Sequence, residues 1–443
     1  MRFRVSFASW VALSAFVLVF ILPTRDARAA AERFDVNGTT GGSGVTNGGS
    51  YTWEGAGYSS TSAGTDPVPW VEGNFLRLAA GTDAGTSNYT ITANSDHSFA
   101  GMFLQSGGGG TVTIDGPGVL SINSGLQGVL VNSSTQNLVI NAKLSGTGGL
   151  ENELSGSLFL YGSNDYGGGT QIGTVAGLNF NNDNSFGTGP ISWRGLNSTT
   201  AGTSVLATPA ATSPITIAND VNTTATTQIF VGVPAAPVTF SGSWTLPATG
   251  TTTFQNQPAG TMVTISGPIS GDAAFKKAGA GTLVLSSSSN SYTGATTVSA
   301  GILQLGAAST LADTSSMILG GGTLDPGGLN QDMSATTTLS LIANSTIDYI
   351  VGASEIDFAN SSALSWTGTL NLANWGSSTK LRVGTDSTGL TPAQLASIEF
   401  NGDGLGTARI TSAGYVVPVP EPATAVLLLI GALMASFGRR RAR

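Results

Sequence analysis

The sequence contains no cysteine and few charged residues. Without cysteine the chain has no disulfides, no thiolate metal ligands and no cysteine nucleophile. Asp, Glu, Lys and Arg together make up 9% of the residues, whereas an ordinary soluble domain has about 25%. Gly accounts for 62 residues, and Ser, Thr and Asn are abundant between evenly scattered Val, Ile and Leu. This composition favours many short strands joined by tight turns, held together by packing and strand pairing alone.

Basic residues are especially scarce in the middle of the chain. Eight of the 17 Lys and Arg lie in residues 1–29 and 439–443, which leaves nine between these ends. The stretch between them also holds 24 of the 25 acidic residues, so its formal charge is about −15. Binding to nucleic acid phosphates requires clustered Lys and Arg, so this charge excludes nucleic acid as a partner. Solubility outside the cell, or weak binding of cations, fits an acidic surface better.

The N-terminus has the features of a secretory signal peptide. Two arginines precede an apolar run over 5–22, and small residues follow at Ala29, Ala30 and Ala31. A positive start, an apolar helix and an A-x-A-like site are the three parts of such a signal. We therefore expect a signal helix over 1–30, cleaved after one of these alanines, and export by the secretion machinery. The alternative is an uncleaved N-terminal anchor.

The C-terminus combines a short motif, an apolar run and a basic cluster. Pro420, Glu421 and Pro422 precede an apolar run of 16 residues, 423–438, which spans about 24 Å as a helix. That length is slightly below the ~20 residues of a usual membrane span. The run is followed by Arg439, Arg440, Arg441 and Arg443. We expect a membrane helix here, with the arginines in the cytoplasm and the body of the chain on the other side of the membrane.

In this order, the parts of the tail resemble the PEP-CTERM sorting signal of Gram-negative bacteria. The resemblance covers residues 418–443. It implies that an exosortase, a membrane cysteine protease, recognises and removes the tail, so that 423–438 crosses the inner membrane only transiently. Such tails occur in cells that also make exopolysaccharide, which makes exopolysaccharide a candidate partner beside the secretion machinery and the exosortase. An ordinary single-span tail anchor is the alternative.

Apolar residues two apart recur at a period of 20 residues in two separate stretches. Such pairs mark strands with one buried face. The first run is Leu138/Ile140, Leu158/Leu160 and Leu178/Phe180, and the second is Val263/Ile265, Leu283/Leu285 and Leu303/Leu305. A fixed period is natural in a β-solenoid, where each coil stacks its inward residues on those of the coil before. Further coils are predicted at Val112/Ile114, Ile215/Ile217 and Val238/Phe240.

The best-formed repeat, residues 271–306, resembles the autotransporter-associated β-strand repeat. The matching positions are Lys277, Gly279, Gly281, Thr282, Leu283, Leu285, Asn290, Tyr292, Thr293, Gly294, Thr296, Val298, Gly301, Leu303 and Leu305. Residues 156–180 look like a decayed copy, which keeps Asn164, Tyr166, Gly168 and Thr170. The resemblance implies a parallel, right-handed β-helix. Gly at positive-φ corners and Asn or Thr bonded to turn backbone are physically consistent with such a fold.

The sequence therefore predicts an all-β fold, a parallel β-helix (β-solenoid) with a C-terminal β-rich cap. The expected parts are the signal peptide 1–30, an N-terminal cap with the first coils 31–110, the solenoid with its repeat 111–329, the C-terminal cap 330–417 and the sorting signal 418–443. Within the C-terminal cap, Thr391 as N-cap, Pro392 at N1 and Gln394 at N3 predict one short helix over 392–398.

The chain offers few residues for catalysis. His97 is the only histidine, which excludes sites built on two histidines, and a lone turn histidine is more often exposed to solvent than catalytic. The remaining candidates are carboxylates, at Asp348, Glu355, Asp357, Asp165 and Asp183. A glycosidase needs two carboxyls about 5–10 Å apart, and nothing in the sequence singles out such a pair. We expect no catalytic residue, no cofactor and no specific metal site.

Tryptophans are the candidates for contact with sugars, because their flat faces can stack on sugar rings. They are Trp53, Trp70, Trp193, Trp244, Trp366 and Trp375. Trp366 and Trp375, nine residues apart, are expected to pack the C-terminal cap instead.

Two functions are compatible with these features. The leading hypothesis is an exported, non-enzymatic protein of the cell surface or extracellular matrix, a β-helical scaffold or adhesin sorted by an exosortase. The alternative is a glycan-active β-helix, a lyase or hydrolase acting on exopolysaccharide. The alternative requires two or three carboxylates that converge in one groove.

Overall fold

The structure is a computed structural model that describes residues 30–419, apart from short gaps. The gaps are 56, 79–86, 105–109, 124, 132–135, 153–155, 174–176, 194–203, 208–212, 225–226, 232–235, 257–258, 312–315 and 334–335. The predicted signal helix and membrane helix fall in 1–29 and 420–443, outside the described residues. Within the described part, no helix is both long and apolar enough to cross a membrane.

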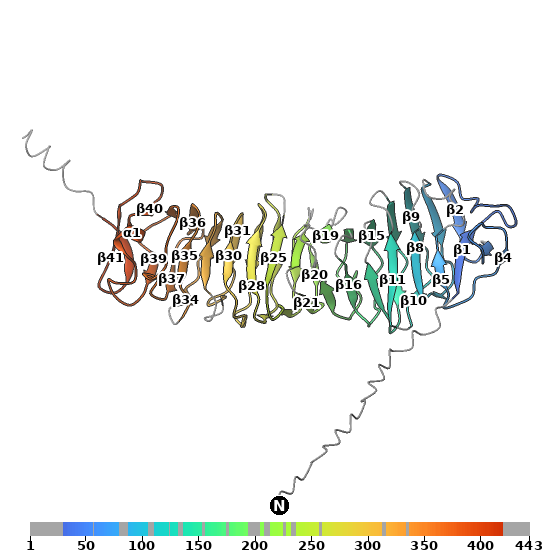
Figure 1. Ribbon diagram of the computed structural model, residues 1–443, viewed down its shortest axis with the longest axis horizontal. Helices are drawn as coiled ribbons and strands as arrows, with labels where there is room; N and C mark the ends of the chain where they lie inside the picture. The colour runs from blue at the N-terminus through green and yellow to red at the C-terminus, as the bar shows by residue number, and fades with distance from the viewer. Residues whose placement is uncertain are drawn as a thin grey trace, which may run out of the picture.

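The described chain forms an elongated rod of stacked β-coils (Figure 1). Strands of successive coils pair in parallel, while consecutive strands of one coil belong to different sheets. For example, β25 (Thr251–Asn256), β26 (Met262–Ile265) and β27 (Ile269–Ser270) join three different sheets. This winding is a parallel β-solenoid, so the predicted all-β fold class is confirmed. The N-terminal strands lie at one end of the rod and β41 (Ala408–Ile410) lies at the other.

Two long sheets run along the rod among the described residues. Sheet I has 13 strands in the order β2 (Gly49–Thr52), β6 (Tyr89–Thr92), β9 (Gly110–Asp115), β12 (Gln136–Ile140), β15 (Ser157–Leu160), β17 (Gly177–Phe180), β19 (Ser204–Ala207), β22 (Thr227–Val231), β25, β28 (Ala274–Ala278), β30 (Thr296–Val298), β32 (Met317–Leu319) and β35 (Leu339–Leu341). Sheet II has 12 strands in the order β27, β24 (Trp244–Thr245), β21 (Val221–Thr223), β18 (Ile191–Trp193), β16 (Thr170–Ile172), β14 (Gly149–Asn152), β11 (Leu126–Val131), β8 (Gly101–Leu104), β5 (Phe75–Arg77), β1 (Ala31–Asp35), β3 (Gly57–Ser59) and β4 (Pro67–Val68).

Three shorter sheets complete the described part of the rod. Sheet III has nine strands in the order β20 (Ile215–Ile217), β23 (Val238–Phe240), β26, β29 (Thr282–Leu285), β31 (Ile302–Leu305), β33 (Thr323–Asp325), β36 (Ser345–Asp348), β38 (Leu370–Ala373) and β40 (Ile398–Phe400). Sheet IV has five strands in the order β34 (Gln331–Met333), β37 (Ser354–Phe358), β39 (Thr379–Val383), β42 (Tyr415–Pro418) and β41. Sheet V has three strands: β13 (Leu144–Ser145), β10 (Leu120–Ser121) and β7 (His97–Ser98).

The 20-residue period of the sequence corresponds to the length of one coil, so residues 20 apart are paired on neighbouring strands. In sheet I, Leu138 pairs with Leu158, and Leu158 pairs with Leu178. In sheet III, Val263 pairs with Leu283, and Leu283 pairs with Leu303. These side chains have no exposed surface. Each coil therefore rests its inward residues on those of the preceding coil, as predicted.

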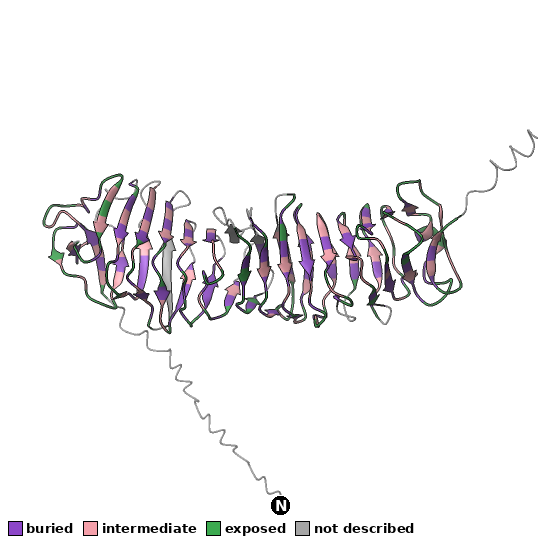
Figure 2. Cartoon of the chain, turned by 180° about the vertical axis from the view of Figure 1, so that it is seen from behind, coloured by how far each residue is buried: buried purple, intermediate pink, exposed green. Residues whose placement is uncertain are grey.

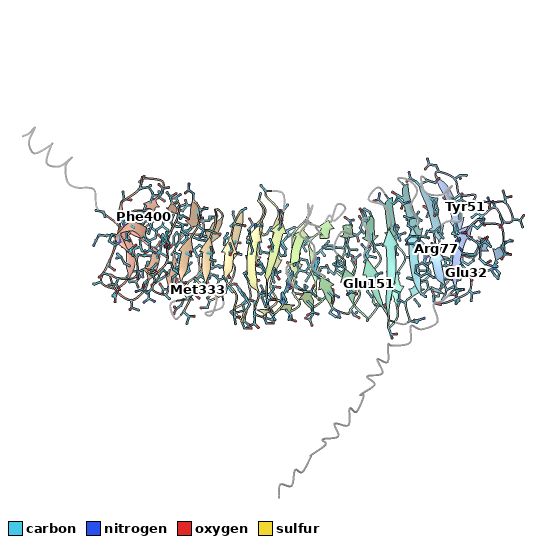
Figure 3. All side chains as sticks on the ribbon, in the orientation of Figure 1. Glu32, Tyr51, Arg77, Glu151, Met333 and Phe400 are labelled. Carbon is cyan, nitrogen blue, oxygen red and sulfur yellow. The ribbon has the colours of Figure 1, made fainter. Side chains whose placement is uncertain are left out.

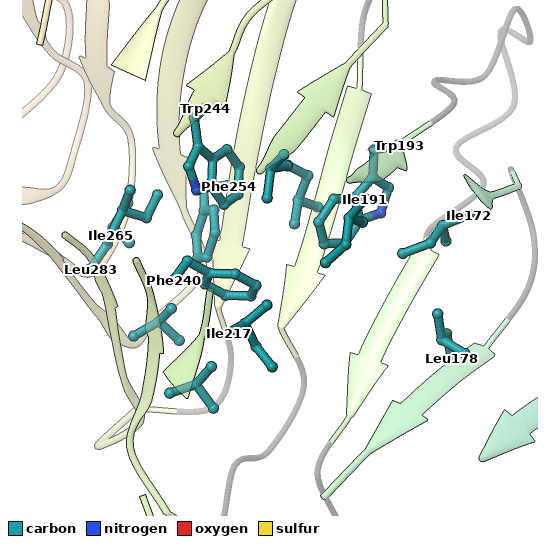
Figure 4. Close-up of a cluster of buried hydrophobic side chains, with 14 of the residues drawn as sticks. Ile172, Leu178, Ile191, Trp193, Ile217, Phe240, Trp244, Phe254, Ile265 and Leu283 are labelled. Atoms are coloured by element: carbon teal, nitrogen blue, oxygen red, sulfur yellow. The ribbon is translucent and has the colours of Figure 1, made fainter. Parts of the chain in front are cut away.

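Inward and outward side chains alternate along the strands (Figure 2), as the two-residue period of a strand requires. The inward side chains form one continuous core along the rod. In its middle, the rings of Trp193 and Trp244 stack at 6.3 Å, and Trp244 meets Phe240 edge to face at 5.6 Å (Figure 4). None of the three rings has exposed surface. Aromatic side chains of this size each bury about 150–250 Å².

Antiparallel strands close both ends of the rod. At the N-terminal end, β3 pairs antiparallel with β1 and with β4. At the C-terminal end, β42 pairs antiparallel with β39 and with β41. This pairing covers backbone groups that the ends of a parallel stack would otherwise expose. The domain boundaries expected from the sequence stay predictions.

A segment of the C-terminal end covers the last strand of sheet I. The indole nitrogen of Trp366 donates to the carbonyl of Leu339 at 3.1 Å. Next to it, the backbone nitrogen of Thr367 donates to the carbonyl of Leu341 at 2.8 Å. The outer edge of β35 is therefore paired with this segment.

The short helix α1 (Pro392–Leu395) begins at the residue that the sequence predicts. Thr391 and Gln394 form the expected capping box, with each side chain accepting from the backbone nitrogen of the other. The Gln394 amide also donates to the carbonyl of Ser361 at 2.9 Å. The helix ends earlier than expected because β40 already begins at Ile398.

Candidate functional site

The asparagine of the repeat fastens neighbouring coils to one another. The Oδ1 of Asn290 accepts a hydrogen bond from the backbone nitrogen of Ile269 at 2.8 Å. Its Nδ2 donates to the carbonyls of Ser287 at 3.0 Å and Thr310 at 2.7 Å. Ile269 and Thr310 lie about one coil before and one coil after Asn290, so a single side chain links three successive coils.

The decayed copy keeps the same contacts. Asn164 is 3% exposed, and its Oδ1 accepts from the backbone nitrogen of Leu144 at 2.8 Å. Its Nδ2 donates to the carbonyl of Ser185 at 2.8 Å. The hydroxyl of Tyr166 lies 2.6 Å from that of Thr170. Three of the four positions that this copy retains, Asn164, Tyr166 and Thr170, are therefore occupied by residues with structural contacts.

The tyrosine and glycine of the best repeat have matching roles. The hydroxyl of Tyr292 lies 2.6 Å from that of Thr296, as in the decayed copy. A Cβ on Gly294 would lie 2.3 Å from the carbonyl of Ala273, and one on Gly168 would meet backbone of a neighbouring coil at 2.4 Å. Both distances are far below van der Waals contact, so only glycine fits where two coils approach so closely.

Lys277 is a buried cation at a corner of the same repeat. It has no exposed surface, and its ammonium donates to the carbonyls of Ala278 at 2.8 Å, Gly279 at 2.7 Å and Ala300 at 3.0 Å. Three carbonyls match the three donors of an ammonium group. Burial nevertheless lowers the pKa of Lys277 to about 8, because a low dielectric disfavours the charged form. These contacts make Lys277 a structural residue that holds a turn between coils.

Glu355 and Asp357 lie on the outward side of β37, in an ion-pair network. Lys380 and Arg382 occupy the paired positions on β39. The Nζ of Lys380 lies 3.1 Å from Oε2 of Glu355, and the Nη2 of Arg382 lies 2.5 Å from Oδ2 of Asp357. The Tyr415 hydroxyl donates to Oε1 of Glu355 at 2.9 Å. Both cations also lie within 6.0 Å of the Tyr415 ring centroid.

The pKa values of the two carboxyl groups are shifted in opposite directions. Burial alone would raise the pKa of Glu355, but hydrogen bonds from Tyr415 and Lys380 lower it. Burial raises the pKa of Asp357 despite its ion pair with Arg382. Carboxyls with diverging pKa values can be a catalytic acid and nucleophile, and residues two apart on a strand are separated by roughly 7 Å. Here, however, each carboxylate is bonded to a cation, so the geometry does not favour a glycosidase pair.

The other candidate carboxylates lie elsewhere on the rod. Asp348 is in sheet III and accepts an amide hydrogen bond at 2.6 Å. Asp165 pairs with Lys143 at 2.5 Å, and Asp183 accepts from the backbone nitrogen of Thr216 at 2.7 Å. The candidates identified in the sequence therefore do not converge in one groove, which is the arrangement that the glycan-cleaving alternative requires.

His97 joins two loops at the N-terminal end of the rod. Its Nδ1 lies 2.8 Å from Oε1 of Glu72, its Nε2 lies 3.2 Å from Oε1 of Glu54, and its ring stacks on Trp53 at 5.1 Å. Its side chain is 10% exposed, so this histidine is mostly covered by its neighbours. Burial opposes ionisation of Glu54, but hydrogen bonds from its own backbone, Ser95 and His97 lower its pKa to about 2. Among the described residues, no group of three or more His, Asp or Glu is placed to hold a metal ion.

Half of the six tryptophans considered for sugar stacking lie inside the protein, and the other three are partly buried. Three of them are at most 1% exposed: Trp53, Trp193 and Trp244. Trp366 and Trp375 pack against the core near the C-terminal end, where Trp375 contacts Phe400 at 5.0 Å, as predicted. Trp70 packs edge to face on Trp53 at 5.4 Å. Contact with sugars through the three buried rings is therefore not supported.

The predicted sorting and signal residues lie at the edges of the described part. Residues 420–422 and 439–443 fall outside it, as does Ala29. Ala30 is described, and its carbonyl accepts a hydrogen bond from β5 at 2.8 Å. Ala31 is the first residue of β1. The position of signal cleavage stays a prediction.

Family models match both motifs that the sequence suggests. A model described as the passenger-associated-transport repeat matches residues 155–176 and 275–305. A model described as the PEP-CTERM protein-sorting motif matches residues 418–442. The chain carries both motifs. The two repeat matches contain Asn164 and Asn290, so the coil-linking contacts described above belong to the repeat itself.

One curated protein is similar over much of the rod. The chain is 30% identical over 282 residues to "Adhesin BmaC autotransporter" of Brucella suis biovar 1 (strain 1330). The alignment covers 57% of this chain but only 7% of that adhesin, so the two proteins are alike over a small part of the relative. No solved structure matches the chain.

Proposed function

We propose that this protein is an exported, non-enzymatic protein of the cell surface or extracellular matrix, in which the β-solenoid is a rigid, adhesin-like scaffold. The observation that carries this proposal is the sorting motif at 418–442, which begins in the last strand of the rod, β42. A sorting tail at the end of a rod suits a protein that presents its long body outside the cell. The similarity to an autotransporter adhesin supports the same location.

The tail supplies the proposed processing step. The secretion machinery would export the chain, the apolar run 423–438 would hold it in the inner membrane, and the arginines at 439–443 would stop transfer. An exosortase would then remove the tail and release the rod or pass it to the surface. Exopolysaccharide is the proposed surrounding material, because sorting tails that this one resembles occur in cells that make exopolysaccharide.

The proposed absence of catalysis rests on the ion pairs of the carboxylates. Glu355 and Asp357 are bonded to Lys380 and Arg382. Asp348 lies in another sheet, and Asp165 and Asp183 lie on distant coils. A scaffold needs only a stiff body and an outer surface, and the stacked coils supply both. In the best repeat, Asn290, Tyr292, Gly294 and Lys277 are accounted for by structural contacts.

Fractionation of the native host tests this proposal. Wild-type protein should appear in surface and medium fractions without its tail, whereas Glu421→Ala should keep its tail and remain with the membranes. Glu399→Ala, an outward carboxylate on β40, is the matched control and should behave as wild type. Normal processing of Glu421→Ala, or wild-type protein retained in the cytoplasm, would contradict the proposal.

A further inference from the structure

Two of the few arginines of the rod lie side by side near its N-terminal end. Arg33 of β1 and Arg77 of β5 are register partners on neighbouring parallel strands, whose spacing is about 4.8 Å. Both side chains are partly exposed on the outer face of sheet II, since Phe34 and Leu76 next to them point into the core. Figure 3 shows Arg77 at this end of the rod. Like charges at paired positions destabilise a sheet, so this arrangement needs a reason.

No carboxylate of the described part neutralises these arginines in an ion pair. The Nη1 of Arg33 donates to the carbonyl of Ser60 at 3.1 Å, and the Arg77 guanidinium lies 5.1 Å from the ring centroid of Phe103. The nearby Glu32 is engaged elsewhere, accepting from Val71 and Asn74. The Nε of Arg77 is buried and has no hydrogen-bond partner among the described residues. Burial and, after it, the charge of Arg77 lower the pKa of Arg33.

The residues around the pair form a small platform. Phe75 lies two residues before Arg77 and on the same side of β5. Its register partners are Ala31 on β1 and Gly101 on β8, which are too small to cover its ring. Phe103 is the partner of Arg77 on β8. We call these six positions the Arg33–Arg77 platform: Ala31, Phe75, Gly101, Arg33, Arg77 and Phe103.

We propose that the Arg33–Arg77 platform binds a carboxylate-bearing sugar of an acidic glycan. The guanidinium groups would take the carboxylate, because their planar forks match its two oxygens, and the partly exposed ring of Phe75 would take the sugar ring. The ligand must carry few and widely spaced charges, because the rest of the body is strongly acidic and repels dense polyanions. This proposal rests on the proposed function, since such a glycan is met only outside the cell.

Titration calorimetry on the purified mature protein tests the platform, with an oligouronate as the acidic probe and a neutral oligoglucan of equal length. Wild type should bind the oligouronate and not the oligoglucan. Arg77→Gln should weaken binding about tenfold or more, because it removes charge-assisted hydrogen bonds. Arg33→Gln/Arg77→Gln should abolish binding, and Phe75→Ala should weaken it. Arg409→Gln, an exposed arginine on β41 at the opposite end, is the matched control and should bind as wild type.

Several results would overturn the proposal. Unchanged binding by the double variant would show that the site lies elsewhere. Equal binding of polyglutamate, together with no effect of Phe75→Ala, would assign the platform to acidic peptides instead. Circular dichroism of each variant, compared with wild type, separates loss of binding from loss of fold. Fractionation of the double variant separates the two proposals, because a correctly sorted protein that fails to bind leaves the proposed function intact.

Discussion

The asparagine that links coils gives the sharpest test of how the rod is held together. Replacing Asn164 by Ala removes its hydrogen bonds to the nitrogen of Leu144 and the carbonyl of Ser185. Both backbone groups would then be buried without this hydrogen-bond partner. Each buried group left unpaired lowers the stability of the fold by about 1–3 kcal/mol. We expect Asn164→Ala to lower the free energy of unfolding by about 2–4 kcal/mol.

Urea unfolding followed by circular dichroism measures this loss. Asn222→Ala is the matched control, because Asn222 points outward from β21 and is exposed, so its replacement should change stability by less than about 0.5 kcal/mol. Asn290→Ala should resemble Asn164→Ala. Since the two asparagines lie many coils apart, the double variant should show the sum of the single effects.

Hydrogen exchange locates the effect, because coils of a solenoid unfold as linked neighbours rather than as one unit. The amide of Leu144 donates directly to Asn164, so it should exchange faster in Asn164→Ala than in wild type. If Asn164→Ala unfolds at the same urea concentration as Asn222→Ala, with unchanged exchange at Leu144, the asparagine does not hold the coils together and the reasoning fails.

Two further residues of the repeat give independent tests. Gly294→Ala should lower the urea midpoint or prevent folding, because its Cβ would lie 2.3 Å from the carbonyl of Ala273. Gly376→Ala is the control and should be tolerated, because no atom lies within 4 Å of its Cβ. Equal effects of the two substitutions would refute the argument that two coils approach too closely at Gly294 for any side chain. The pKa of Lys277 is about 8 in the folded protein, below the ~10.4 of a lysine in an unfolded chain. Between these two pH values the unfolded chain binds more protons than the folded one, so the free energy of unfolding rises with pH. We expect a rise of about 1.5 kcal/mol from pH 8 to pH 9.5. This rise, measured by urea unfolding at each pH, should vanish in Lys277→Met and persist in Lys276→Met, whose side chain is not buried; a rise that survives in Lys277→Met would contradict the assignment.

The coil register could be predicted from the sequence because it depends on a local and repeated property. Leu138, Leu158 and Leu178 must all point inward, and a coil of constant length places them one above another. The start of α1 was predictable for a similar reason, since Thr391 and Gln394 cap the helix through bonds to each other. The end of α1 depends on the next strand of the solenoid, which local signals do not reveal.

The side-chain clusters could not be predicted because the N-terminal coils have irregular lengths. Arg33 and Arg77 become neighbours across 44 residues, and His97 reaches glutamates 25 and 43 residues away. Of these clusters, only the ion-pair network of β37 and β39 has a recognisable pattern in the sequence. The ion pairs of β37 and β39 both join opposite charges 25 residues apart, a spacing that a search for charge pairs at one coil length would find.

Intact mass spectrometry of the protein recovered from the surface and medium fractions of the native host tests the central claim most directly. If the protein is an exported rod sorted through its tail, the mature chain should lack about the first 30 residues and everything after about Pro422. A membrane-bound chain that keeps residues 423–443 would contradict the sorting claim, and the role of the solenoid would then have to be sought at the inner membrane.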